Sequence, residues 1–323
     1  MRKIAVLTSG GDGPGLNACI RAVAREAFHH GAEVYGVQWG YRGLINGEID
    51  ELTSRDVGGI MNRGGTFLGT ARCPEFKEIQ VRRTALRQMN QLGIEGLVVI
   101  GGNGSLAGAL ALHEMDFPTY GVPASIDNDI NGTDMAVGVD TTLNTILDAI
   151  DRVKDTAASH QRAFLIEVMG RDCGYLALAS GIAGGAELIL VPEHEGPSLE
   201  KIAETVVEAY IRGKSHCIMV IAEGWKPGTQ AVAEYLRARK DELGFDVRVT
   251  VLGHVQRGGR PSAYDRLLAT RMGAYAAEHL LEGESGMMAA MRSSKIESFL
   301  LEEAVKTLKP LDLRLLSLSE VMD

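Results

Sequence analysis

Residues 6–15 read VLTSGGDGPG and residues 98–108 read VVIGGNGSLAG. In both stretches a short apolar run ends in a Gly-Gly turn, and a helical pattern follows. Glycine lets backbone amides approach a phosphate closely, and the amino end of a helix adds partial positive charge. One such turn could equally be a tight connection without a ligand. Two of them, Gly10–Gly15 and Gly101–Ser105, favour an α/β protein that binds phosphate groups.

Strand and helix patterns alternate along the rest of the chain. Most strand candidates are continuous apolar runs, which suit strands buried on both faces of a parallel sheet. The predicted strands are Ile4–Thr8, Glu33–Val37, Leu97–Ile100, Thr119–Val122, Ala163–Val168, Leu188–Val191, Ile218–Ala222 and Val247–Leu252. The predicted helices are Asn17–His29, Glu78–Leu92, Thr141–Ala157, Leu199–Ile211, Gln230–Leu243 and Tyr264–Leu281. This alternation predicts doubly wound sheets, and 323 residues suggest two domains.

Composition narrows the function classes. With 45% hydrophobic and 23% charged residues, the chain is expected to be globular rather than disordered. A net charge of −9 argues against general nucleic-acid binding and against a basic membrane patch. No apolar run is long enough for a membrane span, and the apolar run at the start is too short for a signal peptide. The four cysteines have no CxxC spacing, so we expect a reducing cytoplasmic location.

Neither glycine turn fits two familiar nucleotide motifs. GxxxxGK[ST] is absent from both, which leaves a P-loop NTPase unsupported. GxGxxG with an acidic residue about 20 positions later is also absent, so a dinucleotide dehydrogenase is weakly supported.

The segment Ser125-Ile126-Asp127-Asn128-Asp129 follows a predicted strand. One carboxylate of such a pair can accept a hydroxyl proton while the other holds water or magnesium. An Asx turn or a helix cap is the structural alternative, and by itself it is the commoner explanation.

Basic side chains lie near the ends of several predicted strands: Arg162, Arg171, Arg248, His254 and Arg257. Arginine suits phosphate because its planar fork donates two hydrogen bonds together. In an acidic protein this grouping predicts a focused anion pocket, although any single residue could form a surface ion pair instead.

Eight stretches resemble the bacterial ATP-dependent 6-phosphofructokinases. They are TSGGDGPGLNACIR (8–21), NRGGTFLGTAR (62–72), IGGNGSLAG (100–108), SIDNDINGTD (125–134), DTAASHQR (155–162), EVMGRDCG (167–174), AGGAELILVPE (183–193) and LGHVQRGGRP (252–261). The resemblance implies two Rossmann-like three-layer α/β/α domains with mainly parallel sheets and a shared cleft. It assigns ATP to residues 1–138 plus about 256–306, and fructose 6-phosphate to residues 139–255 plus about 307–323. It also implies a homotetramer and magnesium-dependent phosphorylation of fructose 6-phosphate at the 1-hydroxyl, the committing step of glycolysis.

Site residues follow from the same resemblance. Asp127 matches the catalytic base, with Ser125, Asp129 and Arg171 as further catalytic positions. The expected ATP contacts are Gly11, Arg72, Cys73, Gly102, Asn103, Gly104 and Ser105. The expected sugar-phosphate contacts are Ser125, Ile126, Asp127, Met169, Gly170, Arg171, Glu223, His254, Val255, Gln256 and Arg257, with Arg162 and Arg248 supplied by a neighbouring subunit.

An effector site, for a nucleoside diphosphate or phosphoenolpyruvate, is a further implication of the resemblance. The matching residues are Arg21, Arg25, Lys154, Gly185, Glu187, Arg212 and Lys214. Arg21 and Arg25 are four apart and share one helix face, which could also be an ordinary solvated face. Ser54 replaces a family arginine and Ser215 replaces a lysine that relatives often carry. We therefore expect a weaker or altered effector response.

The phosphoryl donor is indicated by two positions. Relatives that use pyrophosphate carry an aspartate at the place of Gly104 and a lysine at the place of Ala124, so both residues favour ATP. Asn103 stands where the family usually has an aspartate near magnesium, and the amide lacks that negative charge. A pyrophosphate-dependent enzyme and a low-activity sugar-phosphate or nucleotide sensor are the alternatives.

Overall fold

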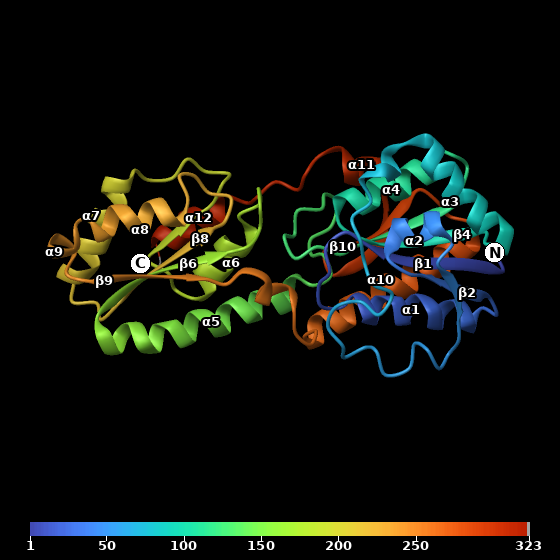
Figure 1. The fold of residues 1–323 in the computed structure, drawn as a ribbon. Helices are drawn as coiled ribbons and strands as arrows, with labels where there is room; N and C mark the ends of the chain where they lie inside the picture. Colours follow the sequence, from blue (N-terminus) through green and yellow to red (C-terminus); the bar gives the residue numbers. More distant parts are fainter. Residues whose placement is uncertain (322–323) are drawn as a thin grey trace. The chain divides into compact units, whose positions relative to one another are not determined.

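The computed structural model describes residues 1–321. Two compact units divide the chain (Figure 1). The first consists of Met1–Thr141 and Arg257–Lys309, and the second of Thr142–Gln256 and the residues from Pro310 onward. One crossing between the units lies inside the helix α5 (Val139–His160).

The first unit is built on a seven-stranded sheet in the order β11-β10-β5-β4-β1-β2-β3. Its five inner strands are parallel, and β3 and β11 run antiparallel at the two edges. β1, β4 and β5 are buried almost throughout, as expected for parallel strands covered on both faces. The strands are β1 (Lys3–Ser9), β2 (Glu33–Val37), β3 (Ile49–Leu52), β4 (Gly96–Gly101), β5 (Thr119–Pro123), β10 (Met287–Arg292) and β11 (Lys295–Leu300).

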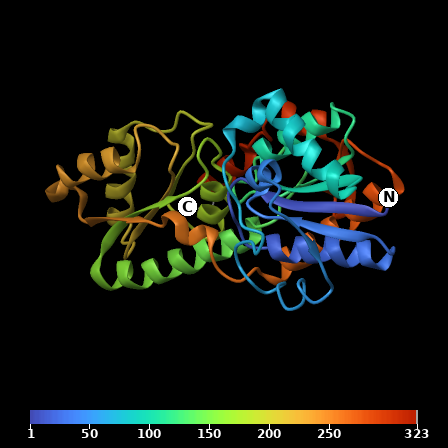
Figure 2. The ribbon, with the colours of Figure 1, turned by 45° about the vertical axis from the view of Figure 1, so that its right-hand side comes forward.

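Helices cover both faces of this sheet. α1 (Leu16–His29) and α10 (Ala263–Glu282) run together along one face in Figures 1 and 2, and α4 (Asn103–His113) packs with α11 (Leu301–Lys306) on the other. Small residues allow α1 and α10 to approach closely, because a Cβ at Gly273 would lie 2.7 Å from the Cys19 carbonyl. The remaining helices are α2 (Gly40–Asn46), α3 (Ile79–Leu92) and the short 3-10 turn η1 (Pro74–Lys77).

The second unit has a four-stranded parallel sheet in the order β7-β8-β6-β9. On one face, α7 and α8 enclose a core that includes Trp225 and Phe245. α5 and α6 pack together, since a Cβ at Gly184 would lie 3.0 Å from Ile150. The elements are β6 (Arg162–Val168), α6 (Tyr175–Ala183), β7 (Leu188–Leu190), α7 (Leu199–Ile211), β8 (Cys217–Ala222), α8 (Thr229–Arg237), α9 (Lys240–Leu243), β9 (Asp246–Val251) and α12 (Arg314–Val321), with η2 (Gly253–Arg257) at the unit boundary.

The predicted α/β class with two domains and mainly parallel sheets is confirmed, and each predicted strand is present within one residue of its expected bounds. The helix predicted for Gln230–Leu243 is wrong as a single helix. At Arg239 the backbone N–H donates a hydrogen bond to the carbonyl of Leu236, three residues earlier, and the resulting turn separates α8 from α9. Among residues 1–321, none of the helices is both long and apolar enough to pass through a membrane.

Candidate active site

Three turns lie side by side at one edge of the first unit's sheet. They follow β1, β4 and β5, which are neighbouring parallel strands, and Ser9 pairs with Gly101 while Gly101 pairs with Pro123. From β1 the chain passes through α1 to β2 on one side, and from β4 through α4 to β5 on the other. The strand order therefore reverses between β1 and β4, which is where open α/β sheets bind ligands.

The glycines of the first two turns allow this close approach. A Cβ at Gly101 would lie 2.5 Å from the Ser9 carbonyl, and one at Gly10 would lie 3.2 Å from Ser105 Oγ. Gly104 is different, because it is exposed and a Cβ there would meet no atom within 4 Å. Close packing thus explains Gly101 but leaves Gly104 open to a neighbouring ligand.

The third turn holds its two carboxylates in different surroundings. Asp127 is buried, and its backbone N–H donates to Ser125 Oγ at 3.3 Å. Ser125 Oγ donates in turn to Asp129 Oδ1 at 3.0 Å, and Asn103 Nδ2 donates to Asp129 Oδ2 at 2.8 Å. The structure therefore joins the second and third turns through the side chain of Asp129.

Asn128, between the two carboxylates, fixes the course of this turn. Its φ of +53° lies in the left-handed region, where asparagine is one of the few tolerated residues. The buried side chain accepts a hydrogen bond from Ala136 N at 3.0 Å and donates to the Asp134 carbonyl at 3.3 Å. The motif prediction quoted Asn128 without giving it a role.

The first turn is lined by a basic side chain. Arg257 Nη1 donates to the Asp12 carbonyl at 3.1 Å, and a Cβ at Gly11 would fall 2.4 Å from that nitrogen. Thr70 Oγ1 donates to the Gly10 carbonyl at 2.8 Å and ties the segment that leads to Arg72 to the same turn. The structure therefore brings Arg257 against Gly11 and Asp12, and it holds the segment that precedes Arg72 beside the same turn.

Tyr41 connects the second turn with the segment around Cys73, and the sequence patterns did not identify it. Its hydroxyl donates to the Ser105 carbonyl at 2.6 Å, and its ring stacks on Phe76 with centroids 4.0 Å apart. Burial, with a further contribution from a hydrogen bond to Glu75, raises the pKa of the Cys73 thiol to about 11. Cys73 is therefore a neutral thiol at physiological pH.

Trp39 is the exposed aromatic residue of this region. The side chain is 46% exposed and rests on Gly69, where a Cβ would lie 2.8 Å from the indole ring. Its φ of +57° is unusual for a bulky residue. Its backbone N–H donates a hydrogen bond to the Leu68 carbonyl at 2.8 Å. The Arg42 guanidinium lies 5.7 Å from the ring centroid.

Asp265 links the chain beyond the third turn to α10. It is fully buried and accepts hydrogen bonds from Gly138 N (2.9 Å), Thr141 N (2.8 Å) and Thr141 Oγ1 (2.5 Å). Burial raises the pKa of this carboxyl, although the bonds from Thr141 and Gly138 oppose the rise. Sequence spacing gave no sign of this contact, which joins residues more than 120 positions apart.

In the second unit, the predicted sugar-phosphate residues group at the carboxyl ends of β6 and β8. Arg171 N donates to Glu223 Oε1 at 3.0 Å, and Met169 N donates to Gln256 Oε1 at 3.2 Å. Arg171 has a φ of +50°, and Gly170 a φ of +143° that suits glycine. His254 and Val255 are exposed on the turn before Gln256.

Arg162 and Arg248 lie toward the amino ends of β6 and β9, opposite the carboxyl ends where Arg171 and Glu223 lie. Arg162 opens β6 and pairs in register with Asp246, which opens β9. Asp246 Oδ2 lies 2.6 Å from Arg248 Nη2 and 3.9 Å from Arg162 Nε. The expectation of one anion pocket that contains all five basic residues is therefore wrong within one chain, because a seven-residue strand separates Arg162 from Arg171.

The predicted effector residues form separate small groups. In the second unit, Lys154 Nζ donates to the carbonyl of Gly184 beside Gly185, and Lys214 Nζ lies 3.3 Å from Glu187 Oε1. Arg212 pairs with Glu208 at 3.7 Å.

In the first unit, Arg25 follows Arg21 by one turn of α1. Arg25 Nη1 donates to Ser54 Oγ at 2.6 Å and Nη2 to the Ser54 carbonyl at 3.0 Å. Ser54 therefore accepts both of these hydrogen bonds from Arg25.

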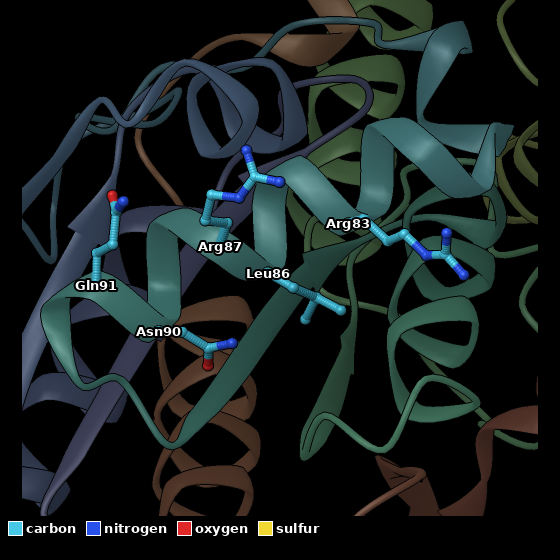
Figure 3. Close-up of a pocket in the computed structure, with 5 residues that line it drawn as sticks. All are labelled: Arg83, Leu86, Arg87, Asn90 and Gln91. Atoms are coloured by element: carbon cyan, nitrogen blue, oxygen red, sulfur yellow. The ribbon is translucent and has the colours of Figure 1, made fainter.

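A pocket of about 440 Å³ lies elsewhere, along one face of α3. Its lining comes from that helix alone, and the side chains project from successive turns (Figure 3). The lining residues are Arg83, Leu86, Arg87, Asn90 and Gln91, and they include none of the predicted site residues.

Comparison with known proteins agrees with the motifs. Residues 3–280 match the family described as phosphofructokinase. The chain is 50% identical over 319 residues to the ATP-dependent 6-phosphofructokinase of Macrococcus caseolyticus, covering 99% of this chain and 98% of that protein. It is also 50% identical over 320 residues to the Bacillus subtilis protein of the same name, covering 99% of each.

Solved structures show the same fold. Phosphofructokinase from Saccharomyces cerevisiae has a TM-score of 0.86 and 38% identity, and the match covers 95% of this chain but 45% of the yeast chain. A pyrophosphate-dependent phosphofructokinase from Marinobacter aquaeolei also has a TM-score of 0.86, at 24% identity over 97% of this chain and 86% of that one, and shows the fold alone. Because sequence and structure agree over nearly its whole length, the chain belongs to the phosphofructokinase family.

Proposed function

We propose that the chain transfers the γ-phosphoryl group of ATP to the 1-hydroxyl of fructose 6-phosphate, giving fructose 1,6-bisphosphate and ADP. One observation carries the proposal: two glycine turns and the Asp127 turn lie side by side at the carboxyl ends of β1, β4 and β5. Identity of about 50% to proteins named ATP-dependent 6-phosphofructokinase supports it. The chain is accordingly a glycolytic kinase.

Asp127 is the proposed general base. As the sugar oxygen bonds to phosphorus and the ADP oxygen leaves, the carboxylate accepts the proton of the 1-hydroxyl. Such a base contributes roughly 10²–10⁴-fold to the rate. Its burial and the anchored backbone N–H support this role, because the carboxylate is held on a turn that Ser125 and Asn128 fix.

Backbone amides and arginines would neutralise the phosphates. The helices α1 and α4 begin at the two glycine turns, so each directs partial positive charge toward an anion there. Arg257 adds a full charge near the first turn, and Arg72, two residues after Thr70, is proposed to add another. Charge neutralisation and alignment are the main requirements of phosphoryl transfer.

Magnesium is proposed to accompany ATP. Among the described residues, no group of three or more His, Cys, Asp or Glu side chains is placed to hold a metal ion. Mg²⁺ usually takes one or two protein carboxylates and completes its shell with water and phosphate oxygens. The Asp129 carboxylate fits that pattern as a protein ligand, and a bound ion would offset charge on the β- and γ-phosphates.

The second unit is proposed to hold the sugar phosphate through Met169, Gly170, Arg171, Glu223 and residues 254–256. Arg162 and Arg248 are proposed to serve a neighbouring subunit of a homotetramer, which their place at the opposite sheet edge supports. The Lys154, Gly185, Glu187 and Lys214 groups, with Arg21, Arg25 and Arg212, are proposed to respond to a nucleoside diphosphate or phosphoenolpyruvate in the cytoplasm.

The deciding experiment is a coupled assay with fructose 6-phosphate, magnesium and either ATP or pyrophosphate. Asp127→Ser is expected to lower kcat about 10²–10⁴-fold at an unchanged thermal midpoint. Asp50→Ser, at an exposed aspartate of the same unit, is the matched control and should retain activity. Turnover by Asp127→Ser within tenfold of wild type would rule out the base. Pyrophosphate-driven turnover would support the other donor, and substrate binding without turnover would support a sensor.

A further inference from the structure

The side chain of Asn103 contacts the turn that carries Asp127 and Asp129. Its side chain is half-buried at the start of α4, and it reaches across to the turn after β5, where Nδ2 donates to Asp129 Oδ2 at 2.8 Å. A carboxylate can only accept hydrogen bonds, so the amide must present its nitrogen to Asp129. The amide oxygen is thereby turned away from the carboxylate.

Asp129 passes this constraint to the proposed catalytic residues. Its other oxygen accepts a hydrogen bond from Ser125 Oγ at 3.0 Å. The lone pairs of Ser125 Oγ are then left to accept a hydrogen bond from Asp127 N at 3.3 Å. The main chain of Asp129 is also held, since its carbonyl accepts Lys309 N at 3.0 Å. Three hydrogen bonds thus connect Asn103 with the backbone of Asp127, and those donated by Asn103 and Ser125 both end on the Asp129 carboxylate.

We propose that Asn103 is a positioning residue whose neutral amide holds the Asp127 turn in its active arrangement without a divalent cation. An aspartate at position 103 would place a second carboxylate against Asp129, and two carboxylates about 3 Å apart cannot both stay ionised without a cation or a proton between them. The amide removes that requirement. The order of the turn in this chain is therefore independent of the magnesium that arrives with ATP.

Thermal unfolding in EDTA and in Mg²⁺ tests the proposal without substrates. Wild type should have the same midpoint in both, whereas Asn103→Asp should melt about 5 °C lower in EDTA and recover with Mg²⁺. Asn103→Ala should also melt lower but should not respond to Mg²⁺, since it adds no charge. Asn90→Asp, at an exposed asparagine of α3, controls for a general charge effect and should not respond to Mg²⁺.

The kinetic test separates positioning from simple stability. Asn103→Ala should lower kcat about tenfold with a smaller change in the KM for fructose 6-phosphate, as expected for a lost hydrogen bond to a charged group. In a double-mutant cycle with Asp129→Ala, the two losses should be clearly less than additive.

Three results would overturn the proposal: an Asn103→Asp midpoint that equals wild type in EDTA, a low midpoint that Mg²⁺ does not raise, or additive kinetic losses. The kinetic arm rests on the proposed function. The unfolding arm does not, so the two can fail separately.

Discussion

Gly104→Asp tests how the chain selects its phosphoryl donor. The glycine is the second residue of α4 and is exposed, and an added Cβ meets nothing within 4 Å, so the aspartate side chain is sterically accommodated. Replacing a helical glycine and placing an acid in the first helical turn both favour folding. Together they are expected to leave stability unchanged or raise it by about 1 kcal/mol.

The cost should appear only when ATP binds. Repulsion between a carboxylate and one phosphate charge about 4 Å away weakens the binding of ATP by about 4 kcal/mol at an effective dielectric constant of about 20. That is about a thousandfold in kcat/KM for ATP, since 1.36 kcal/mol corresponds to a factor of ten. The same reasoning predicts a small effect on the KM for fructose 6-phosphate.

Steady-state assays of Gly104→Asp and Gly104→Asn, each with a thermal midpoint, provide the measurement. The asparagine has nearly the same volume without the charge, so it should lose about tenfold or less. If Gly104→Asp keeps kcat/KM for ATP within tenfold of wild type, the position does not face a phosphate. If Gly104→Asn loses as much as Gly104→Asp, bulk rather than charge excludes the nucleotide.

Further predictions concern other parts of the chain. Because burial raises the pKa of Cys73 to about 11, only about one thiol in a thousand is ionised at pH 8. Alkylation should be slow at pH 8, accelerate as the pH rises toward 11 and slow again with ATP, and mass spectrometry showing rapid modification at pH 8 would contradict this. Asp265→Ala removes the buried carboxylate that accepts hydrogen bonds from Gly138 and Thr141. It should lower the free energy of unfolding in urea by about 3–5 kcal/mol relative to the control Asp50→Ala. A decrease below about 1 kcal/mol would refute the structural role of Asp265. Ser54→Arg adds a positive charge beside Arg25 and should strengthen activation by a nucleoside diphosphate, whereas Ser54→Ala, which only removes the hydroxyl that accepts from Arg25, should not. Equal activation curves would count against an effector role.

The central strands could be predicted because burial on both faces requires continuous apolar runs. The later strands β10 and β11 could not, since MMAAMR in β10 has no β-branched residue and resembles a helix. Pairing of β10 with β5 and β11 makes this segment a strand, and that is a tertiary effect. The single helix expected over Gln230–Leu243 failed for a related reason, because apolar spacing continues through the turn at Arg239.

Motifs predicted which residues belong to the site region, but not how they touch. Asn103 and Asp129 are 26 positions apart, and Arg257 reaches Asp12 across 245. Nothing local in the sequence encodes either contact. The prediction of one anion pocket from the basic residues near strand ends also failed. The sequence pattern did not distinguish the amino end of a strand from its carboxyl end, and Arg162 and Arg248 lie toward the end opposite Arg171.

Each unit contains one of the two tryptophans, so intrinsic fluorescence can report on the two units separately. Trp39 belongs to the first unit and is 46% exposed, whereas Trp225 belongs to the second and is 2% exposed. Indole fluorescence is red-shifted in water and blue-shifted in an apolar core, so the emission spectrum is the sum of two separable components. Iodide should quench the red component and spare the blue one. Unfolding of each unit can therefore be followed optically without an engineered label, and a single-tryptophan variant of either kind assigns the signals.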